Sequence, residues 1–375
     1  MVLLIGNYRP DQQQSMQRFG TMMLEGLTAA GVPAELIQPQ AVFGKLRFAG
    51  GFIAKWLAYV DKFLLFPRLL RAKLQSAPSI VHICDHSNSM YAQHVGGIPV
   101  VVTCHDLLAV RGALGDATDT PASITGKFLQ RWILAGLRRA SVIACDSKAT
   151  RDDARQFVTG GADRPKLQVI TLGLSYPYRR LERAEARARL APLPGLNADL
   201  PFVLHVGSNL RRKNREAVLR IFARCRDGWD GQLVFVGERL SETLNAQAQA
   251  LGISTRVVQL GQQENQALEA LYNCATAFLF PSRFEGFGWP IIEAQACGCP
   301  VVCSSAGPMT EVAGTGALLR EPEDEEGFAQ DLLRLTSGEE RARWSARALE
   351  NARRFTTERM IADYCQLYRS LAPVC

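Results

Sequence analysis

The sequence predicts an α/β protein built from two Rossmann-like domains that face each other across a cleft. Short apolar runs alternate with segments of helical period from residue 2 to about residue 173, and the same alternation starts again at residue 202. Between the two series lies a segment that fits neither pattern and ends in Ala191-Pro-Leu-Pro-Gly195, a composition typical of a linker. Alternating strands and helices favour parallel sheets covered by helices.

The first series supplies the elements of the first domain. We expect strands at residues 2–5, 79–83, 100–104, 142–145 and 167–171, and helices at residues 13–30, 125–140 and 148–159. A charged, alanine-rich segment at residues 181–190 predicts a short helix before the linker. We therefore place the first domain at residues 1–190.

The second series repeats the pattern. Strands are expected at residues 202–206, 232–236, 257–260, 276–280, 300–303 and 317–319, and helices at residues 214–226, 241–251, 264–273 and 290–298. The second domain is placed at residues 196–355. Residues 356–371 form a last amphipathic pattern of helical period.

The composition is that of a globular protein, with 375 residues, 47% of them hydrophobic and 21% charged. Its ten cysteines lie mostly in apolar contexts, which predicts buried thiols in a reducing cytoplasm. Cys297, Cys299 and Cys303 do not have the spacing of a zinc site, so we expect no metal. No secretory signal is recognised, and no stretch approaches the roughly 20 apolar residues that cross a bilayer. We expect a cytoplasmic protein.

The formal charge of +7 is concentrated between residues 42 and 74. Asp61 is the only acid there, and aromatic and aliphatic residues alternate with seven basic ones: Lys45, Arg47, Lys55, Lys62, Arg68, Arg71 and Lys73. Such a stretch is typical of a segment that lies on an anionic membrane surface. Two ordinary helices with solvated lysines would give a similar pattern. The density of aromatic residues favours contact with a membrane or a lipid-linked substrate.

Two glutamates lie in Phe280-Pro-Ser-Arg-Phe-Glu-Gly-Phe-Gly-Trp-Pro-Ile-Ile-Glu293. Glu285 follows the carboxyl end of a buried strand, and Pro290 suits the first turn of a helix that carries Glu293. In open α/β sheets, ligands bind at this edge, and the N-terminus of a helix there favours anions. Two carboxylates beside an anion site suggest a ligand with phosphate and hydroxyl groups, such as a nucleotide sugar.

A second polar loop follows the strand at residues 202–206. Gly207 allows close approach of the backbone, and Arg212 and Lys213 can place a guanidinium fork and a point charge against a diphosphate. A solvated basic loop would look similar. Both this loop and the glutamate loop are expected at the same edge of the sheet, and the coincidence favours a binding site.

The strand ends of the first half carry further polar residues. His105 and Asp106 follow the strand at residues 100–104, and their position toward the expected cleft favours function over a structural role. Asp146 and Ser147 follow the strand at residues 142–145, where Ser147 also suits a helix cap, so both interpretations stay open. Gly6 opens a long polar loop after the first strand.

Several familiar signatures are missing from the sequence. Gly6 stands alone, so there is neither a dinucleotide-binding glycine fingerprint nor a P-loop. No Asp-x-Asp pair follows a strand, so no Mg²⁺ site for a sugar diphosphate is expected. We expect no cofactor, and Arg212, Lys213 and helix amides would neutralise the diphosphate.

Taken together, these segments resemble the retaining glycosyltransferases of family 4 (glycosyltransferase group 1), which have the two-domain GT-B fold. The resemblance rests on Glu285 and Glu293 within Pro-Ser-x-x-Glu-Gly-Phe-Gly-x-Pro-x-x-Glu-Ala-x-Ala-x-Gly-x-Pro-Val, and on Val-Gly-x5-Lys-Asn ending at Asn214. It covers most of the chain and is strongest over residues 202–319. It implies that the tail helix, at about residues 356–375, packs back on the first domain.

The resemblance implies a role for each candidate residue. Glu285 would contact the donor sugar, with His105 as the second catalytic candidate near it, and Glu293 would bind the ribose hydroxyls. The other donor-binding candidates are Gly207, Arg212 and Lys213 for the diphosphate, the backbone amides of Phe287, Gly288 and Trp289, and Val258 and Leu260 at the base pocket. The acceptor-side or loop candidates are Gly6, Asn7, Asp106 and Ser147.

The chain departs from the family pattern at two places. Gly6-Asn7-Tyr8 replaces the Gly-Gly that the family often has in its first loop, and Ser208 replaces a basic residue that is common after Gly207. Both departures concern the loops where diphosphate and acceptor approach.

The expected function is metal-independent transfer of a hexosyl group from a GDP- or UDP-linked sugar to a hydroxyl acceptor, with retention at the anomeric carbon. The expected acceptor is a lipid-linked or membrane glycan in cell-surface polysaccharide synthesis, with the protein peripheral on the inner face of the membrane and no nucleic-acid partner. Two alternatives stay open: a nucleotide-sugar epimerase of the same fold, and a non-catalytic nucleotide-sugar-binding protein.

Overall fold

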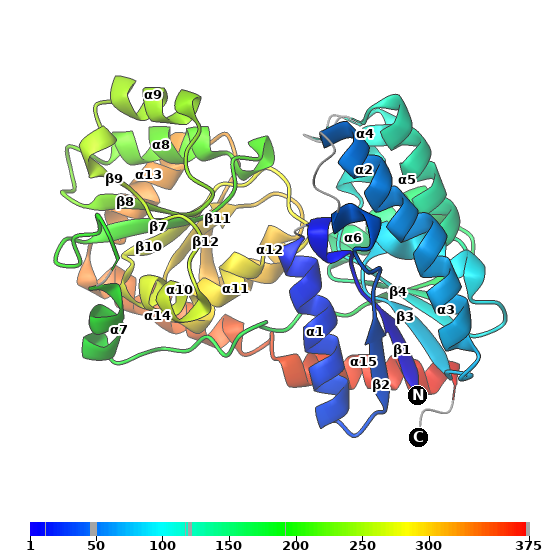
Figure 1. The fold of residues 1–375 in the computed structure, drawn as a ribbon. Coiled ribbons are helices and arrows are strands. Elements are labelled where there is room, and N and C mark those ends of the chain that lie inside the picture. Colours follow the sequence, from blue (N-terminus) through cyan, green and yellow to red (C-terminus); the bar gives the residue numbers. More distant parts are fainter. Residues whose placement is uncertain (12, 46–50, 117, 119–121, 192, 373–375) are drawn as a thin grey trace. The chain divides into compact units, whose positions relative to one another are not determined.

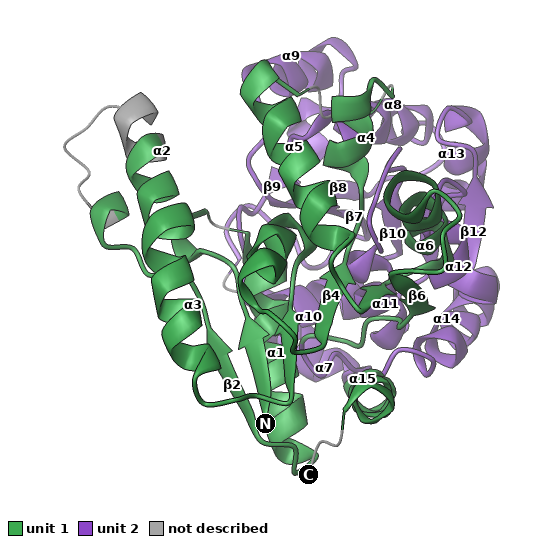
Figure 2. Ribbon diagram, turned by 90° about the vertical axis from the view of Figure 1, so that its right-hand side faces the viewer, with its two compact units in different colours: residues 1–175, 357–375 green, residues 176–356 purple. Residues whose placement is uncertain are grey.

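The computed structural model describes residues 1–11, 13–45, 51–116, 118, 122–191 and 193–372, leaving aside the side chains of residues 45 and 51–55. The chain folds into two compact units (Figure 1 and Figure 2). Unit 1 comprises Met1–Ser175 and Thr357–Cys375, and unit 2 comprises Tyr176–Thr356. Each unit is organised around one six-stranded sheet.

The sheet of unit 1 is wholly parallel and has the strand order β2-β1-β3-β4-β5-β6. Its strands are β1 (Val2–Ile5), β2 (Ala34–Ile37), β3 (Ile80–Ile83), β4 (Val100–Cys104), β5 (Val142–Cys145) and β6 (Lys166–Val169). The four central strands are buried on both faces, which explains why they read as continuous apolar runs. Their carboxyl ends meet at one edge, where the polar loops of unit 1 begin.

Helices cover both faces of this sheet (Figure 2). The helices of unit 1 are α1 (Gln14–Ala29), α2 (Gly51–Val60), α3 (Phe66–Leu74), α4 (Leu108–Leu114), α5 (Ile124–Leu137), α6 (Lys148–Ala154) and α15 (Thr357–Leu371). Single turns are added by η1 (Arg9–Asp11), η2 (Phe43–Lys45), η3 (Asp61–Leu65) and η5 (Arg155–Thr159), and η4 (His86–His94) is a longer 3-10 segment. Side chains of α3, η4 and α5 share one apolar core with the sheet.

The sheet of unit 2 is also parallel, with the order β12-β11-β10-β7-β8-β9. Its strands are β7 (Phe202–Gly207), β8 (Gln232–Gly237), β9 (Val257–Gln259), β10 (Ala277–Phe280), β11 (Val301–Ser304) and β12 (Ala317–Arg320). Its helices are α7 (Arg183–Leu190), α8 (Arg215–Arg224), α9 (Glu242–Ala250), α10 (Asn265–Cys274), α11 (Trp289–Ala296), α12 (Met309–Ala313), α13 (Glu325–Arg334) and α14 (Gly338–Ala352). The short turns η6 (Arg211–Lys213), η7 (Ser254–Arg256) and η8 (Gly314–Gly316) complete the unit.

The division between the units falls at Ser175, whereas the sequence places it at residue 190. The reason is the packing of α7, which belongs to unit 2. Arg189 of α7 forms an ion pair of 2.8 Å with Glu269 of α10, and the backbone N–H of Arg179 donates to the same glutamate. Pro192 of the expected linker lies outside the described residues.

The last helix of the chain belongs to unit 1, although 181 residues of unit 2 precede it. The hydroxyl groups of Tyr364 and Thr103 lie 2.7 Å apart, and the hydroxyl of Tyr368 lies 2.7 Å from Nδ1 of His82. Burial lowers the pKa of His82 to about 3, so its ring is neutral. A buried hydrogen-bonded chain therefore holds α15 against β3 and β4.

Candidate active site

The loop after β10 positions the two glutamates that the sequence singled out. Gly288 has φ +106°, and a side chain there would lie 3.2 Å from Ile291 and would also be strained, so glycine suits this turn. Helix α11 starts at the next residue with Pro290 in its first turn, and Glu293 follows on that helix. The local sequence thus puts Glu285 in the loop and Glu293 on the helix, as predicted from the Gly and Pro spacing.

The structure brings Arg212, Lys213 and Glu285 together. Nη1 of Arg212 lies 2.7 Å from Oε2 of Glu285, and Nζ of Lys213 lies 2.7 Å from Oε1. The side chain of Glu285 is 7% exposed, and that of Lys213 is 12% exposed. The Arg212 guanidinium also donates to the carbonyl of Phe284. The two loops that the sequence predicted at one sheet edge therefore form one buried ionic cluster.

The cluster holds two positive charges against one negative charge. Burial raises the pKa of Glu285, but Lys213 and Arg212 outweigh it and hold the pKa below its usual value. Burial lowers the pKa of Lys213, and Glu285 opposes this effect. Removing one partner of such a buried pair is costly, since the other charge stays buried without compensation. The excess positive charge makes this edge attractive to an anion.

Two residues that sequence reasoning missed hold this cluster in place. Asn214 has φ +54°, and its side-chain amide donates to the carbonyl of Pro281 at 3.0 Å, which ties the loop after β7 to the loop after β10. Arg215 is 3% exposed, and its guanidinium donates to the carbonyls of Gly207 and Glu238. In the sequence, Asn214 gave a signal only as the last residue of the Val-Gly-x5-Lys-Asn motif, and Arg215 gave none beyond that of a helix start, because their hydrogen-bond partners lie far away along the chain.

Glu293 lies in a different environment. Its side chain is buried, and Oε2 accepts a hydrogen bond of 3.1 Å from the hydroxyl of Tyr272 on α10. Burial and the nearby Glu293 carboxylate raise the pKa of Tyr272, which keeps that hydroxyl a donor. The two glutamates are therefore held separately, Glu285 by cations and Glu293 by a phenol.

The other donor-side candidates occupy three positions. Gly207 closes β7, and Gly237 of the neighbouring strand approaches its carbonyl so closely that a side chain on Gly237 would collide. The ring of Phe287 packs edge-on against Phe355 at 5.9 Å, so this side chain belongs to the core of unit 2. The last two candidates, Val258 and Leu260, are mostly buried in and after β9, the edge strand of the sheet. Trp289 opens α11.

In unit 1, polar side chains follow the carboxyl ends of the central strands. We call Asn7, Asp85, His105 and Asp146 the polar row. Asn7 follows β1, and its side-chain amide donates to Asp85 at 2.5 Å and to Gln13 at 2.6 Å. Asp85 follows β3 and also accepts from the backbone N–H of Ser87. Gly6 donates its backbone N–H to Ile37 and so continues the sheet. Asp85 was not recognised in the sequence, because it stands in no motif.

His105 and Asp146, which follow β4 and β5, form a buried pair. Nδ1 of His105 donates to Asp146 at 2.6 Å, and Nε2 donates to the carbonyl of Cys84 at 3.0 Å. Two acceptors facing both ring nitrogens fit the protonated imidazolium. Burial lowers the pKa of His105, but Asp146 and Asp85 outweigh it and raise the pKa to about 9. Burial raises the pKa of Asp146, and His105 opposes this effect.

The remaining acceptor-side candidates have local structural partners. The carboxylate of Asp106 accepts from the backbone N–H of Leu108 at 3.1 Å. Ser147 caps α6, since its hydroxyl oxygen accepts from the N–H of Thr150 at 3.1 Å. These contacts match the capping interpretation that the sequence left open for Ser147.

The single acid of the basic stretch has a structural role. Asp61 is 1% exposed, and its carboxylate accepts from the backbone N–H groups of residues 42–44 and from the hydroxyl of Tyr8 at 2.8 Å. Lys62 pairs with Asp11 and Lys73 with Glu35, whereas Arg68 and Arg71 are exposed. Arg47 and the side chains of Lys45 and Lys55 lie outside the described residues.

Metal-binding clusters and membrane-spanning helices are both missing from the described part of the chain. No group of three or more His, Cys, Asp or Glu side chains there could hold a metal ion. None of the helices found in the described residues is both long enough and apolar enough to span a membrane.

The fold and these loops define a class of protein, and family models identify it. Residues 189–351 match the family described as "Glycosyl transferases group 1", and residues 23–175 match "Glycosyltransferase Family 4". Together the matches take in most of the chain. The chain belongs to the group 1 glycosyltransferases of the family 4 type.

Among curated proteins, the chain is similar to D-inositol 3-phosphate glycosyltransferases. It is 31% identical over 324 residues to that of Mycobacterium bovis, a match that covers 79% of this chain and 64% of the relative. It is 32% identical over 231 residues to that of Nocardia farcinica, covering 59% and 49%. The chain thus spans about half to two thirds of the length of these relatives.

Solved structures share the fold over the whole chain. Sucrose-phosphate synthase from Thermosynechococcus elongatus superimposes with a TM-score of 0.78 at 22% identity, covering 99% of this chain and 98% of that one. HepE from Anabaena, solved in complex with UDP and glucose, gives 0.73 at 18% identity with 99% of each chain covered. The predicted GT-B fold with two Rossmann-like domains is confirmed.

Proposed function

We propose that this protein transfers a hexosyl group from a nucleoside-diphosphate sugar to a hydroxyl acceptor, with retention at the anomeric carbon. The observation that carries the proposal is the buried cluster of Arg212, Lys213 and Glu285 at the carboxyl edge of the unit 2 sheet. Family membership and the UDP and glucose bound to the structurally similar HepE support a nucleotide-sugar donor.

The cluster is built to exchange partners when a donor binds. Without a donor, Glu285 neutralises part of the charge of Arg212 and Lys213. A diphosphate offers both cations stronger anionic partners, because it presents several oxygens to the guanidinium fork and the ammonium group. The carboxylate of Glu285 is then free to accept hydrogen bonds from sugar hydroxyls. Glu293, buried on α11, is proposed to bind the ribose.

The charge state of Glu285 favours a positioning role over acid catalysis. The cations hold its pKa below the usual value, so it stays ionised and does not supply a proton to the leaving group. The two-carboxylate scheme of glycoside hydrolysis needs one protonated acid beside the bond. We propose instead that a leaving diphosphate oxygen takes the proton of the acceptor hydroxyl on the same face of the sugar, while Arg212 and Lys213 stabilise the developing negative charge.

Unit 1 is proposed to bind the acceptor through the polar row that includes Asn7 and His105. The curated relatives act, by their names, on an inositol phosphate, which fits a hydroxylated acceptor. The basic, aromatic segment at residues 42–74 supports a lipid-linked or membrane glycan and a peripheral position on a membrane.

The donor half of the proposal is tested by calorimetric titration with UDP, GDP and dTDP. We expect one of the three to bind the wild-type protein, and Glu293→Ala to weaken that binding by roughly tenfold to a hundredfold, as for lost hydrogen bonds to a charged group. Glu285→Ala should keep nucleotide binding within a few-fold and lower sugar transfer by about a hundredfold or more. The exposed Glu350→Ala is the matched control.

Glu285→Ala leaves Lys213 buried without its carboxylate partner, so this variant can also destabilise the fold. The milder variant Glu285→Gln, together with thermal unfolding of both variants, separates loss of fold from loss of function. Full transfer by a folded Glu285→Ala enzyme would refute the assignment. Binding without product release for every lipid-linked and polyol acceptor tried would instead indicate a nucleotide-sugar-binding protein.

A further inference from the structure

Helix α5, outside the basic stretch, exposes the two most accessible large apolar side chains of the described residues. Ile124 is 89% exposed and Phe128 is 73% exposed. They stand four residues apart, so they share one face of the helix. Exposed apolar residues that gather on one face mark an interaction surface more often than scattered ones do.

This exposure is built into a well-anchored helix. The hydroxyl of Ser123 accepts the backbone N–H of Gly126 and caps the first turn. In the second half of the helix, Ile133, Leu134 and Leu137 are buried in the core of unit 1. The apolar face at Ile124 and Phe128 is therefore held outward by a fixed helix and is not a frayed end.

The charged side chains that α5 itself carries are of one sign. Lys127 and Arg131 are exposed beside Phe128, and the sequence of α5 contains no acid. Neither cation is paired with a carboxylate among the residues that the structure describes. By contrast, Arg111 on α4 is paired with Asp116. On α5, the charges that flank this apolar face are thus two cations without a carboxylate partner in the described part of the chain, which fits an anionic, amphipathic partner.

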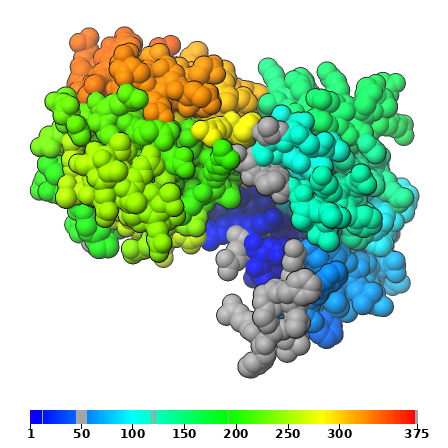
Figure 3. All heavy atoms as spheres, turned by 90° about the horizontal axis from the view of Figure 1, so that it is seen from above, coloured from blue at the N-terminus to red at the C-terminus, as the bar shows by residue number. Residues whose placement is uncertain are grey.

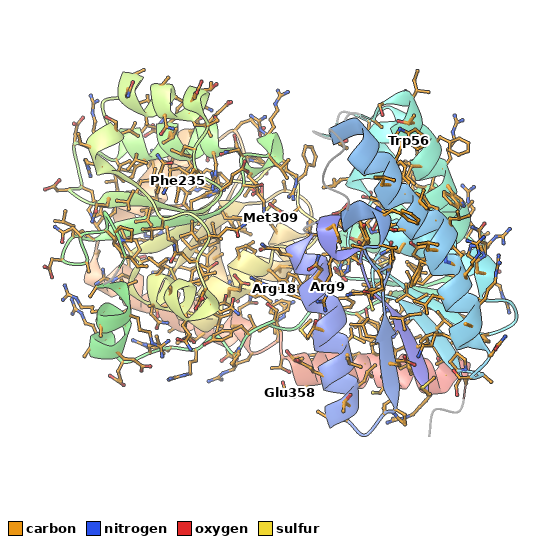
Figure 4. The ribbon with its side chains drawn as sticks, in the orientation of Figure 1. Arg9, Arg18, Trp56, Phe235, Met309 and Glu358 are labelled. Carbon is orange, nitrogen blue, oxygen red and sulfur yellow. The ribbon has the colours of Figure 1, made fainter. Side chains whose placement is uncertain are left out.

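A row of aromatic rings runs from the basic stretch to Trp132 of α5. Neighbouring ring centroids lie 5.7 Å apart for Trp56 and Tyr59, 5.3 Å for Tyr59 and Phe63, and 5.0 Å for Phe63 and Trp132 of α5. Trp56 is itself 54% exposed (Figure 4). Trp132 lies one helical turn beyond Phe128, so the two segments contribute to one surface.

Both segments begin at the same end of unit 1. In a parallel sheet, the connecting helices start at the carboxyl edge, and Figure 1 shows α2, α4 and α5 gathered there. Figure 3 looks at the molecule from that end, where the cyan-to-teal atoms of residues 108–137 lie at the surface. The polar row with Asn7 and His105 follows the same sheet edge.

We propose that the face of α5 formed by Ile124, Lys127, Phe128 and Arg131 docks on an anionic lipid bilayer. Ile124 and Phe128 insert among the acyl chains near the headgroups, and Lys127 and Arg131 bind lipid phosphates. The inference rests on the proposed function, in that a lipid-linked acceptor gives a membrane position its purpose. It brings the acceptor edge of unit 1 to the bilayer surface.

The test is flotation of the full chain with vesicles of phosphatidylcholine, with and without phosphatidylglycerol, in the absence of donor and acceptor. We expect binding to the phosphatidylglycerol vesicles only. The double variant Ile124→Ser with Phe128→Ser and the double variant Lys127→Gln with Arg131→Gln should each weaken it by about tenfold or more. Leu200→Ser with Leu210→Ser, two exposed leucines of unit 2, and Arg239→Gln with Arg341→Gln are the matched controls and should bind as the wild type does.

Equal binding by all variants, or no binding of the wild type, would overturn the proposal. A second copy of the chain could also occupy this face, and light scattering without vesicles tests that alternative. A wild-type dimer that the Ile124→Ser, Phe128→Ser variant converts to a monomer would assign the face to a second copy. Because no step requires sugar transfer, the outcome is independent of the donor experiment. Insertion has its own readout, since tryptophan fluorescence of Phe128→Trp should shift to the blue with anionic vesicles.

Discussion

At the scale of single residues, the charge of His105 decides what that side chain can do. Its two ring N–H groups donate to Asp146 and to the carbonyl of Cys84. An imidazolium with both protons engaged cannot accept a proton from a substrate. The positive charge, buried beside Asp85 and Asp146, can still stabilise negative charge and orient the strand ends. In our proposal His105 is therefore a positioning residue.

This charge state predicts a pH dependence of stability. The pKa of His105 is raised from about 6.5 to about 9 in the folded protein, so its contribution is complete below pH 6.5 and is lost as the pH rises toward 9. A shift of this size corresponds to about 3 kcal/mol. We expect the difference in unfolding free energy between the wild type and His105→Gln, measured by urea denaturation, to shrink across that window.

The comparison of the two proteins removes the contribution of titrating groups that do not interact with His105, whereas Asp85 and Asp146 belong to the measured effect. A difference that stays constant from pH 6 to about pH 9 would show that folding does not raise the pKa of His105.

The ionic cluster could be predicted from the sequence, and its supports could not. Arg212, Lys213 and Glu285 each follow a strand, and carboxyl ends of parallel strands meet at one edge, so their proximity follows from the strand pattern alone. Arg215 reads as the first residue of an amphipathic helix. Its burial depends on carbonyl groups at the ends of β7 and β8, and nothing local in the sequence reports those contacts.

At the scale of elements, Arg215 joins the ends of two strands. Its guanidinium donates to the carbonyls of Gly207, Val236 and Glu238 and lies 5.1 Å from the ring centroid of Phe235. The carbonyl of Gly207 also accepts the backbone N–H of Glu238 at 3.2 Å, so the guanidinium reinforces a contact between the two strand ends. One side chain of α8 thus fixes the loops that carry the ionic cluster.

Arg215→Lys tests this role, because lysine keeps the charge and loses the fork. We expect unit 2 to lose about 2–4 kcal/mol of stability, because lysine cannot make the several hydrogen bonds that the buried guanidinium donates, and we expect nucleotide binding to weaken with it. Urea denaturation and titration with the nucleotide that binds best measure the two effects. Arg220→Lys, at a partly exposed ion pair with Glu325, is the control and should change stability by less than about 1 kcal/mol. Equal effects of both variants would contradict the role.

The sequence predicts the buried strands better than the exposed edge strand. The central strands read as apolar runs and lie within a few residues of their predicted bounds. Strand β2 was missed, because it is an edge strand in which only Ile37 is buried. The predicted helix at residues 148–159 is α6 followed by the wider turn η5. The predicted boundary of the first domain, residue 190, differs from the boundary at Ser175, because α7 packs against α10. Its ion pair joins residues that are far apart in the sequence, and a local sequence pattern does not show such a contact.

At the scale of the whole molecule, unit 1 is assembled from two distant parts of the chain. Helix α15 contributes Tyr364 and Tyr368 to a hydrogen-bonded chain that ends on Thr103 and His82. All four side chains are buried. Unit 1 is therefore complete only when the last helix is in place.

The double variant Tyr364→Phe with Tyr368→Phe measures how strongly the tail is held. It leaves Thr103 and His82 buried with fewer partners, so we expect a loss of about 2–5 kcal/mol in the stability of unit 1. Limited proteolysis should cleave unit 1 earlier than unit 2. Tyr176→Phe, at a half-buried ring of unit 2, is the control. Unchanged unfolding of the double variant would mean that apolar packing alone holds α15.

The position of α15 in the chain also decides which unit a cut would damage. Unit 2 is one uninterrupted stretch of chain and ends at Thr356, before α15 begins. Removal of α15 would leave unit 2 with all of its chain, whereas the sheet of unit 1 would keep its face around His82 and Thr103 uncovered. A cut after Thr356 would thus spare unit 2 and would leave unit 1 exposed to chaperones and proteases, although the cut removes no residue of its sheet.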